Sequence, residues 1–442
     1  MTSRKSKTIK IIDDTSYSRI KEEYLEVLAS LSSKYSYNKD DVFSNLVNFK
    51  TNLSKSKHRW LNYKQGYASR LVEEILSRES NSLYKESIVL DPFCGVGTTN
   101  LVCQEHSINS VGYDINPVAT TVAIAKTQGY LESDIRNIKE HLNKISNTTV
   151  INNIEIQVPD AKVLRSSFEI DTLKTLLQLS KYIEDLDNSK VEMFLKTVLI
   201  SIIEGCSCRI KDGNGIKLAK NKNVRNDVIE YFLSEATSYL NDIEVNVSLA
   251  DVDILEESYI NSIDTKNYDL VIFSPPYANC FDYFEVYKLE MWVAGFAKKY
   301  EDFAQYRDIA LRSHVNSKFS HSIHNENHNV SVVSELLATT NLWNKNIPTM
   351  IKGYFDDMTK VLNQIYERLN TDRRCYIVVA NSGYRGILVP TDLLLIEIAE
   401  KIGFRLDELV FARQIRASSQ QSEVLNGNYN NLMRESVIIL RK

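Results

Sequence analysis

Residues 87–99, SIVLDPFCGVGTT, decide the fold. The apolar run at the start predicts a buried strand, and two glycines then form a turn before the helical pattern TTNLVCQEH. A second strand pattern, SVGYDINP, begins at Ser110. A strand, a helix and a second strand in this order form the unit from which mostly parallel sheets with helices on both faces are built. We therefore expect an α/β protein whose glycine turn borders a ligand pocket.

Further strand patterns lie far downstream. They are IEVNVSLADVDIL (243–255), YDLVIFSPPY (268–277) and three late segments, RCYIVVANS, ELVFARQI and ESVIILRK. The last two are separated by the turn-rich sequence NGNYNN, which suits an antiparallel hairpin at one edge of the sheet. The strands therefore alternate with helices over most of the chain, apart from this closing hairpin.

Two long insertions interrupt the strand patterns. The first contains successive amphipathic helices such as VEMFLKTVLISIIEG, and the second is rich in His and Asn with few apolar repeats. We expect an N-terminal helical extension (1–58), a first core part with the glycine turn (59–130), a helical insertion (131–240), a second core part (241–296), a second insertion (297–350) and a third core part (351–442).

Composition excludes several classes of protein without selecting a function. The apolar content of 43% allows a sizeable core, and the net charge of -4 gives no general attraction to nucleic acid. Any DNA contact must therefore come from local basic surface. The six cysteines lack the paired spacing of a zinc site, and no apolar run is long enough to span a membrane. We expect a cytoplasmic protein with reduced thiols, no metal and no membrane partner.

The glycine turn and the strand after it carry the features of a nucleoside site. Asp114, at the tip of the second strand, can accept hydrogen bonds from both ribose hydroxyls. The glycines alone are equally consistent with tight packing of strand against helix. The turn lacks the GxGxxG spacing for pyrophosphate and the Lys of a phosphate loop. The pattern therefore favours a nucleoside bearing an amino acid, such as S-adenosylmethionine, over a dinucleotide or ATP.

The second chemical signal is the loop Ser274-Pro275-Pro276-Tyr277 after the strand YDLVIF. Consecutive prolines fix the backbone and remove two amide donors, which leaves carbonyls free to accept hydrogen bonds. The Ser274 oxygen and the Pro275 carbonyl can hold the protons of an exocyclic amine, and Tyr277 offers a face on which a flipped base can stack. The alternative is a proline-stiffened turn beside a buried tyrosine.

Together, DPFCGVGTT and SPPY resemble the cofactor and catalytic loops of the amino-methyltransferases that modify cytosine or adenine in DNA. The resemblance implies a Rossmann-like fold with a mostly parallel, seven-stranded sheet and an antiparallel edge hairpin. It implies S-adenosylmethionine as cofactor, and Ser274, Pro275, Pro276 and Tyr277 as the catalytic residues. Ten residues would bind the cofactor: Asp91, Pro92, Phe93, Gly95, Gly97, Thr98, Asp114, Asp251 for the adenine edge, and Lys64 and Tyr67 on RWLNYKQGYASRLVEEIL.

The serine that leads SPPY is most typical of cytosine enzymes in this family, whereas aspartate is typical of adenine enzymes. The resemblance therefore favours N4 of cytosine, with N6 of adenine as the alternative. An RNA methyltransferase would require appended RNA-binding modules, and a silent DNA-binding module would have lost the acids or the prolines; neither pattern is present. The helix after SPPY, with Phe281, Phe284, Tyr287 and Met291, is expected to serve only the core.

The expected partner is double-stranded DNA with a flipped target base, with a separately encoded restriction endonuclease as a further partner. The basic loop after Cys208 can contact phosphates, and FARQIRASSQQ carries side chains that read base edges. Each basic segment can equally be a solvated surface. The candidate DNA-binding residues are Arg209, Lys211, Lys217, Arg413, Arg416, Gln420 and Gln421.

Overall fold

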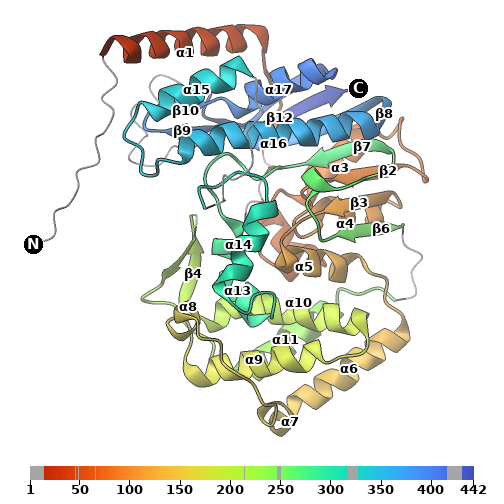
Figure 1. Cartoon of the computed structure of the whole chain (residues 1–442). Coiled ribbons are helices and arrows are strands. Elements are labelled where there is room, and N and C mark those ends of the chain that lie inside the picture. Colours follow the sequence, from red (N-terminus) through yellow and green to blue (C-terminus); the bar gives the residue numbers. More distant parts are fainter. Residues whose placement is uncertain are drawn as a thin grey trace, which may run out of the picture.

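The computed structural model describes residues 14–44, 46–47, 49–64, 66–213, 215–245, 250–316, 327–415 and 431–442. Within these ranges the central sheet has eight strands in the order β1-β11-β12-β8-β7-β2-β3-β6 (Figure 1). The strands are β1 (Asn38–Lys39), β2 (Ile88–Asp91), β3 (Asn109–Tyr113), β6 (Val252–Leu255), β7 (Tyr268–Phe273), β8 (Leu369–Ala380), β11 (Arg405–Gln414) and β12 (Arg434–Arg441).

The directions of the strands confirm the expected α/β fold. The strands β8, β7, β2, β3 and β6 are all parallel, whereas β12 runs antiparallel to both β8 and β11. The late hairpin expected from the sequence is therefore β11 with β12. The described sheet has eight strands where seven were expected, because the two-residue β1 of the N-terminal region pairs with β11. So short a strand has no periodicity that a sequence can reveal.

The central strands are buried on both faces. On β7, Leu270 and Ile272 pack with one cluster of core residues, and Val271 and Phe273 pack with another on the opposite face. Successive side chains of a strand point to opposite faces, so a strand covered on both sides is apolar throughout. This explains why YDLVIF reads as an unbroken apolar run.

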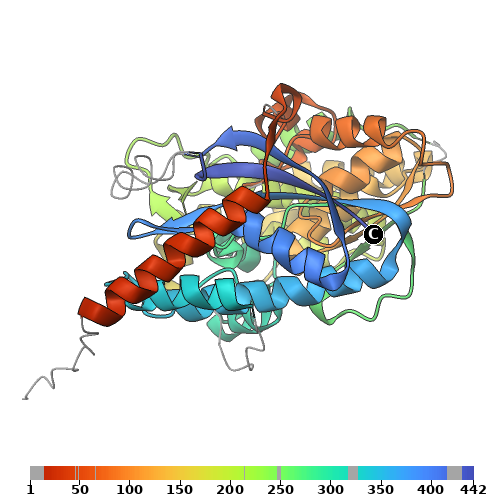
Figure 2. The same ribbon diagram turned by 90° about the horizontal axis from the view of Figure 1, so that it is seen from above.

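Helices from distant parts of the chain cover the two faces. One face packs against α1 (Asp14–Lys34), α15 (His328–Ala338), α16 (Ile347–Arg368) and α17 (Thr391–Ile402). Figure 2 shows α1 crossing this helical layer. The other face packs against α2 (Asp41–Ser44), α3 (Ser69–Arg78) and α4 (Thr98–Glu105). No helix within the described ranges is long and apolar enough to cross a membrane.

A second helical layer lies beyond the β6 edge, at the bottom of Figure 1. It contains α6 (Glu132–Ser146), α7 (Thr148–Asn152), α8 (Lys162–Arg165), α9 (Ile170–Glu184), α10 (Ser189–Cys206) and α11 (Val228–Leu240). The helix α5 (Pro117–Thr127) connects it to the sheet, since α5 contacts both β6 and α10. The hairpin of β4 (Arg209–Asp212) and β5 (Gly215–Leu218) projects from this layer.

Three short helices lie between the second layer and the sheet: α12 (Tyr283–Val286), α13 (Lys288–Val293) and α14 (Tyr300–Ile309). The hairpin of β9 (Ser382–Tyr384) with β10 (Ile387–Val389) lies instead beside α15, which β10 contacts. The segment that follows α14 is anchored to α16 by Arg312, which pairs with Asp356 at 2.5 Å and Asp357 at 2.6 Å. These ion pairs therefore hold the 310–314 segment against α16.

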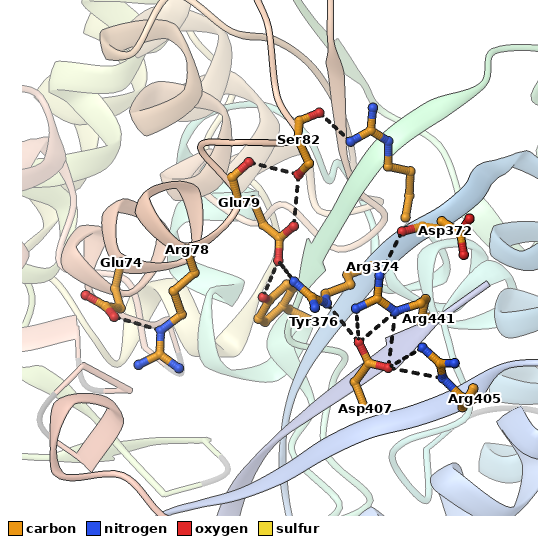
Figure 3. A network of polar contacts seen from close by, with 11 residues as sticks. Glu74, Arg78, Glu79, Ser82, Asp372, Arg374, Tyr376, Arg405, Asp407 and Arg441 are labelled. Carbon is orange, nitrogen blue, oxygen red and sulfur yellow. Dashed lines mark hydrogen bonds and ion pairs between the residues drawn. The ribbon is translucent and has the colours of Figure 1, made fainter.

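A network of charges ties α3 to the amino end of β8, as Figure 3 shows. Glu79, which ends α3, accepts hydrogen bonds from Tyr376 at 2.6 Å and from Arg374 at 2.8 Å. Arg374 also pairs with Asp407 of β11, and Asp407 pairs with Arg441 of β12. Three neighbouring strands are thereby connected at the edge of the sheet where β8 begins.

Candidate functional site

The predicted site residues meet at the carboxyl ends of the parallel strands. Asp91 ends β2, Asp114 follows β3 and Ser274 follows β7. A pocket opens there, and its walls include Asp114, Ser274 and the turn after β2. Ligands of open α/β sheets bind at this edge, where the loops after adjacent strands diverge.

The glycine turn needs its two glycines for different reasons. Gly95 has a φ of +52° and lines the pocket, while Gly97 has a φ of +72° and precedes α4. A Cβ on Gly97 would approach the Cβ of Ala123 to 2.9 Å, closer than side chains pack. Gly95 therefore exposes backbone to a ligand, and Gly97 permits α4 and α5 to pack closely.

Asp91 organises the turn from behind rather than facing the pocket. Its carboxylate accepts hydrogen bonds from the hydroxyls of Tyr67 at 2.9 Å and Thr99 at 2.7 Å, and from the amide of Phe93 at 3.1 Å. Burial raises the pKa of Asp91 to about 6, and these donors oppose the shift. Asp91 and Gly97 are absent from the pocket wall, whereas Pro92, Phe93 and Thr98 are part of it.

Asp114 is the half-buried acid that faces the pocket. One carboxylate oxygen accepts from the Gly95 amide at 2.9 Å and the other from the Asn116 amide at 2.8 Å. A carboxylate has about four acceptor positions, so both oxygens keep capacity for a ligand. Burial raises the pKa of Asp114 to about 6. The site therefore presents acceptor groups in an apolar surrounding, which suits ribose hydroxyls.

The prediction that Asp251 contacts adenine is wrong. Asp251 is exposed and precedes β6, and its backbone carbonyl accepts a hydrogen bond from Ser110 near the start of β3. It therefore lies at the amino edge of the sheet, away from the pocket. The carboxyl end of β6 leads instead to Glu257 and Ser258, both of which line the pocket. Strand β6 begins at Val252, directly after Asp251, and ends at Leu255, so Asp251 lies at the opposite end of the strand from the pocket.

A second pocket adjoins the first, and several other predicted site residues line it. Tyr63, Tyr67 and Ser274 belong to the walls of both pockets. Lys64, expected at the cofactor, lies on the wall of the second pocket alone, and its amide donates to the Tyr287 hydroxyl at 2.8 Å. Ser274 is thus the catalytic-loop residue that borders both spaces.

The Ser274–Tyr277 loop is held by contacts with strand β12. The Tyr277 hydroxyl donates to Glu435 at 2.5 Å, and the Ser274 hydroxyl donates to the Tyr277 oxygen at 3.4 Å. Pro275 is buried and Pro276 lines the first pocket. Burial, together with the nearby charge of Glu435, raises the pKa of Tyr277 well above its ordinary value. The tyrosine hydroxyl therefore stays protonated.

The predicted DNA-binding residues lie in four different settings. Lys211 is a correction, because its side chain is only 4% exposed and pairs with Glu290 at 2.5 Å and Glu204 at 2.8 Å. Arg209 donates to Ser166 and Ser167, while Lys217 is more than half exposed beside Asp212. Arg413 pairs with Glu435 on the wall of the second pocket. Three further residues lie outside the described part of the chain: Arg416, Gln420 and Gln421.

Several site residues were missed from the sequence. Phe284 was expected only in the core, yet it lines the first pocket together with Tyr283. Leu311 and His314 reach the same pocket from the second insertion. The acidic end of VDILEES was a usable signal for Glu257, whereas nothing local marks Glu435, because its position depends on the pairing of β12 with its neighbours.

Aromatic rings support the wall shared by the two pockets. Tyr63 stacks on Tyr287 at 5.2 Å and on Tyr283 at 6.0 Å between ring centroids. The buried Lys211 ammonium lies 4.7 Å from the Tyr287 ring centroid. Lys211 therefore supports this wall from behind, which explains its burial in a segment whose sequence suggested phosphate contact.

The structure is an α/β fold with a mostly parallel sheet and a pocket at the carboxyl ends of its parallel strands. A family model described as DNA methylase matches residues 2–126 of the chain. The chain is 27% identical over 458 residues to the type II methyltransferase M.BsoBI of Geobacillus stearothermophilus, covering 90% of this chain and 88% of that protein. It is 26% identical to the type II methyltransferase M.AvaI of Nostoc sp. (strain PCC 7120), covering 90% and 89%.

Other similarities are shorter or weaker. The type II methyltransferase M.MjaII of Methanocaldococcus jannaschii is 40% identical over 87 residues, which are 20% of this chain and 15% of that protein. The solved rRNA methyltransferase aviRa of Streptomyces viridochromogenes aligns with 89% of this chain and 92% of its own, at a TM-score of 0.30 and 9% identity.

Proposed function

We propose that the protein transfers a methyl group from S-adenosylmethionine to the exocyclic N4 amino group of cytosine in double-stranded DNA. The observation that carries the proposal is the position of Ser274, which borders both the pocket beside Asp114 and the second pocket. A catalytic group between two adjoining pockets can bring two bound molecules together at one point.

The residues of the first pocket fit S-adenosylmethionine. Asp114 can accept from the ribose hydroxyls and Glu257 from a neighbouring polar group, while Phe93 and Phe284 provide apolar surface. The turn around Gly95 lets the ligand approach the backbone closely. When bound, S-adenosylmethionine supplies an electrophilic methyl group on a positively charged sulfur.

The second pocket fits a flipped base. Ser274 and the Pro275 carbonyl can accept the two protons of an exocyclic amine, which restores the lone pair of a nitrogen otherwise conjugated with the ring. The new bond joins this nitrogen to the methyl carbon while the carbon–sulfur bond breaks, and the nitrogen then releases one proton to solvent. Tyr277 offers an aromatic face for the base. The chain needs only to position the base and shield the reacting atoms from water.

Basic side chains around the second pocket suit a nucleic acid backbone. Lys50, Lys64 and Arg413 all contribute to its wall, and each is exposed. Cations at this rim would neutralise the phosphates that flank a flipped nucleotide. The exposed Lys217 of the β4–β5 hairpin and the 297–350 segment extend the proposed DNA surface.

The relatives are named type II methyltransferases, which supports a role in a type II restriction-modification system. We propose a separately encoded endonuclease as the further partner. The leading serine of SPPY supports cytosine N4 over adenine N6. The test is incubation of the purified protein with S-adenosylmethionine and unmethylated genomic DNA, followed by mass spectrometry of the nucleosides. We expect N4-methylcytosine. N6-methyladenine would correct the target base, and the absence of both from DNA would overturn the proposal.

A further inference from the structure

Four side chains form a continuous polar chain from the sheet edge to the second pocket. Arg413 donates through Nε to one oxygen of Glu435 at 2.5 Å. The other oxygen of Glu435 accepts from the Tyr277 hydroxyl at 2.5 Å, and the Tyr277 oxygen accepts from the Ser274 hydroxyl at 3.4 Å. All four line the second pocket.

The sheet fixes the outer end of this chain. Arg413 of β11 and Glu435 of β12 are directly opposed partners, and Glu435 also pairs with Ala380, the last residue of β8. The Glu435 side chain is 5% exposed, whereas that of Arg413 is 44% exposed. Glu435 is therefore a buried acceptor that the sheet holds in place, whereas the guanidinium of Arg413 that pairs with it reaches solvent.

The direction of each hydrogen bond can be deduced by starting from Arg413 and moving along the chain to Ser274. A carboxylate paired with Arg413 has no proton, so Tyr277 must donate to it. Because the Tyr277 hydroxyl donates its only proton to Glu435, the Tyr277 oxygen can act toward Ser274 only as an acceptor. The Ser274 hydroxyl in turn donates its only proton to Tyr277, so the Ser274 oxygen can act toward the pocket only as an acceptor.

We propose that Glu435 is a positioning residue that, through Tyr277, fixes Ser274 as a hydrogen-bond acceptor for the amino group of the target base. This inference rests on the proposed function and assigns a role to a residue outside the SPPY loop. An exocyclic amine donates protons and suits this arrangement, whereas a ring carbonyl such as that of uracil offers only lone pairs and is repelled.

The test is a double-mutant cycle on Glu435→Gln and Tyr277→Phe, read as the single-turnover methylation rate at saturating DNA and S-adenosylmethionine. Glutamine can donate to the Tyr277 oxygen, which lets Tyr277 donate to Ser274 and reverses the chain. We expect Glu435→Gln to slow methylation about ten-fold to a hundred-fold, the effect of one misdirected hydrogen bond. The double variant should be no slower than Tyr277→Phe alone, because Glu435 acts only through that hydroxyl.

Glu79→Gln is the matched control. Glu79 accepts from an arginine and a tyrosine as Glu435 does, but it lies at the opposite end of β8 (Figure 3). We expect this variant to lose stability and keep the single-turnover rate. If Glu435→Gln does not fold, a double-mutant cycle of Tyr277→Phe with Ser274→Ala tests the same chain of hydrogen bonds. The decrease in methylation rate of that double variant should then be smaller than the product of the two single decreases.

The outcomes separate the inference from the proposed function. If the wild-type protein does not methylate DNA, the proposed function fails. If the wild type methylates DNA and Glu435→Gln keeps its rate, or if the losses in the cycle multiply, the role assigned to Glu435 is wrong.

Discussion

At the scale of single residues, the carboxylates of Asp91, at the end of β2, and Asp114, directly after β3, have different tasks. Asp91 receives hydrogen bonds from Tyr67, Thr99 and the Phe93 amide, so it shapes the turn without lining the pocket. Asp114 receives two backbone amides and faces the pocket. The sequence assigned both to ligand contact, because strand ends identify acids near the site but do not show where each carboxylate points.

The raised pKa of Asp114, about 6, makes a prediction about stability. Between its ordinary pKa and 6, the folded protein binds more protons at this carboxyl than the unfolded chain, so the group loses stabilising effect as pH rises. Relative to Asp114→Asn, the wild type should lose about 1 kcal/mol of unfolding free energy between pH 5 and pH 8. Urea denaturation at both pH values measures this difference.

The control for this experiment is Asp212→Asn, at an exposed carboxyl of the β4–β5 hairpin. Its unfolding free energy should follow the wild type across the same pH range. A constant difference between the wild type and Asp114→Asn would show that burial does not penalise the charge at Asp114.

At the scale of elements, the 310–314 segment closes one side of the first pocket. Leu311, Ser313 and His314 line that pocket, and Arg312 between them points to α16. The Arg312 side chain is 6% exposed, and its Nε and Nη2 atoms donate to Asp356 and Asp357. The side chains on either side of Arg312 therefore line the pocket, while Arg312 itself fixes the segment to α16.

Replacing this anchor should affect both folding and ligand binding. Arg312→Met leaves Asp356 and Asp357 buried without their main partner, which should cost about 3–5 kcal/mol of unfolding free energy. Loosening of the flanking residues should also weaken binding of S-adenosylmethionine, measured by calorimetry. The matched control is Lys360→Met, which contacts the same carboxylates from a 46% exposed position and should cost at most about 1 kcal/mol. Equal losses for both variants would contradict the anchor.

At the scale of the whole molecule, the sequence predicted the sheet and the two loops that meet at its edge, because both depend on local patterns. The apolar runs located β2, β3 and β7, and the Gly and Pro positions located the turns after β2 and β7. It did not predict the position of Asp251 before β6, the burial of Lys211 or the place of Glu435. These depend on strand register and on contacts between segments distant in the chain, which no local pattern encodes.

The central claim is that the junction of the two pockets transfers methyl groups to DNA. The most direct measurement is incorporation of labelled methyl groups from S-adenosylmethionine into unmethylated duplex DNA by the wild type, Ser274→Ala and the control Ser201→Ala, whose hydroxyl donates within α10. We expect Ser274→Ala to lose at least about a hundred-fold in rate, with the control unchanged. A wild-type rate in Ser274→Ala, or no incorporation by the wild type, would contradict this account.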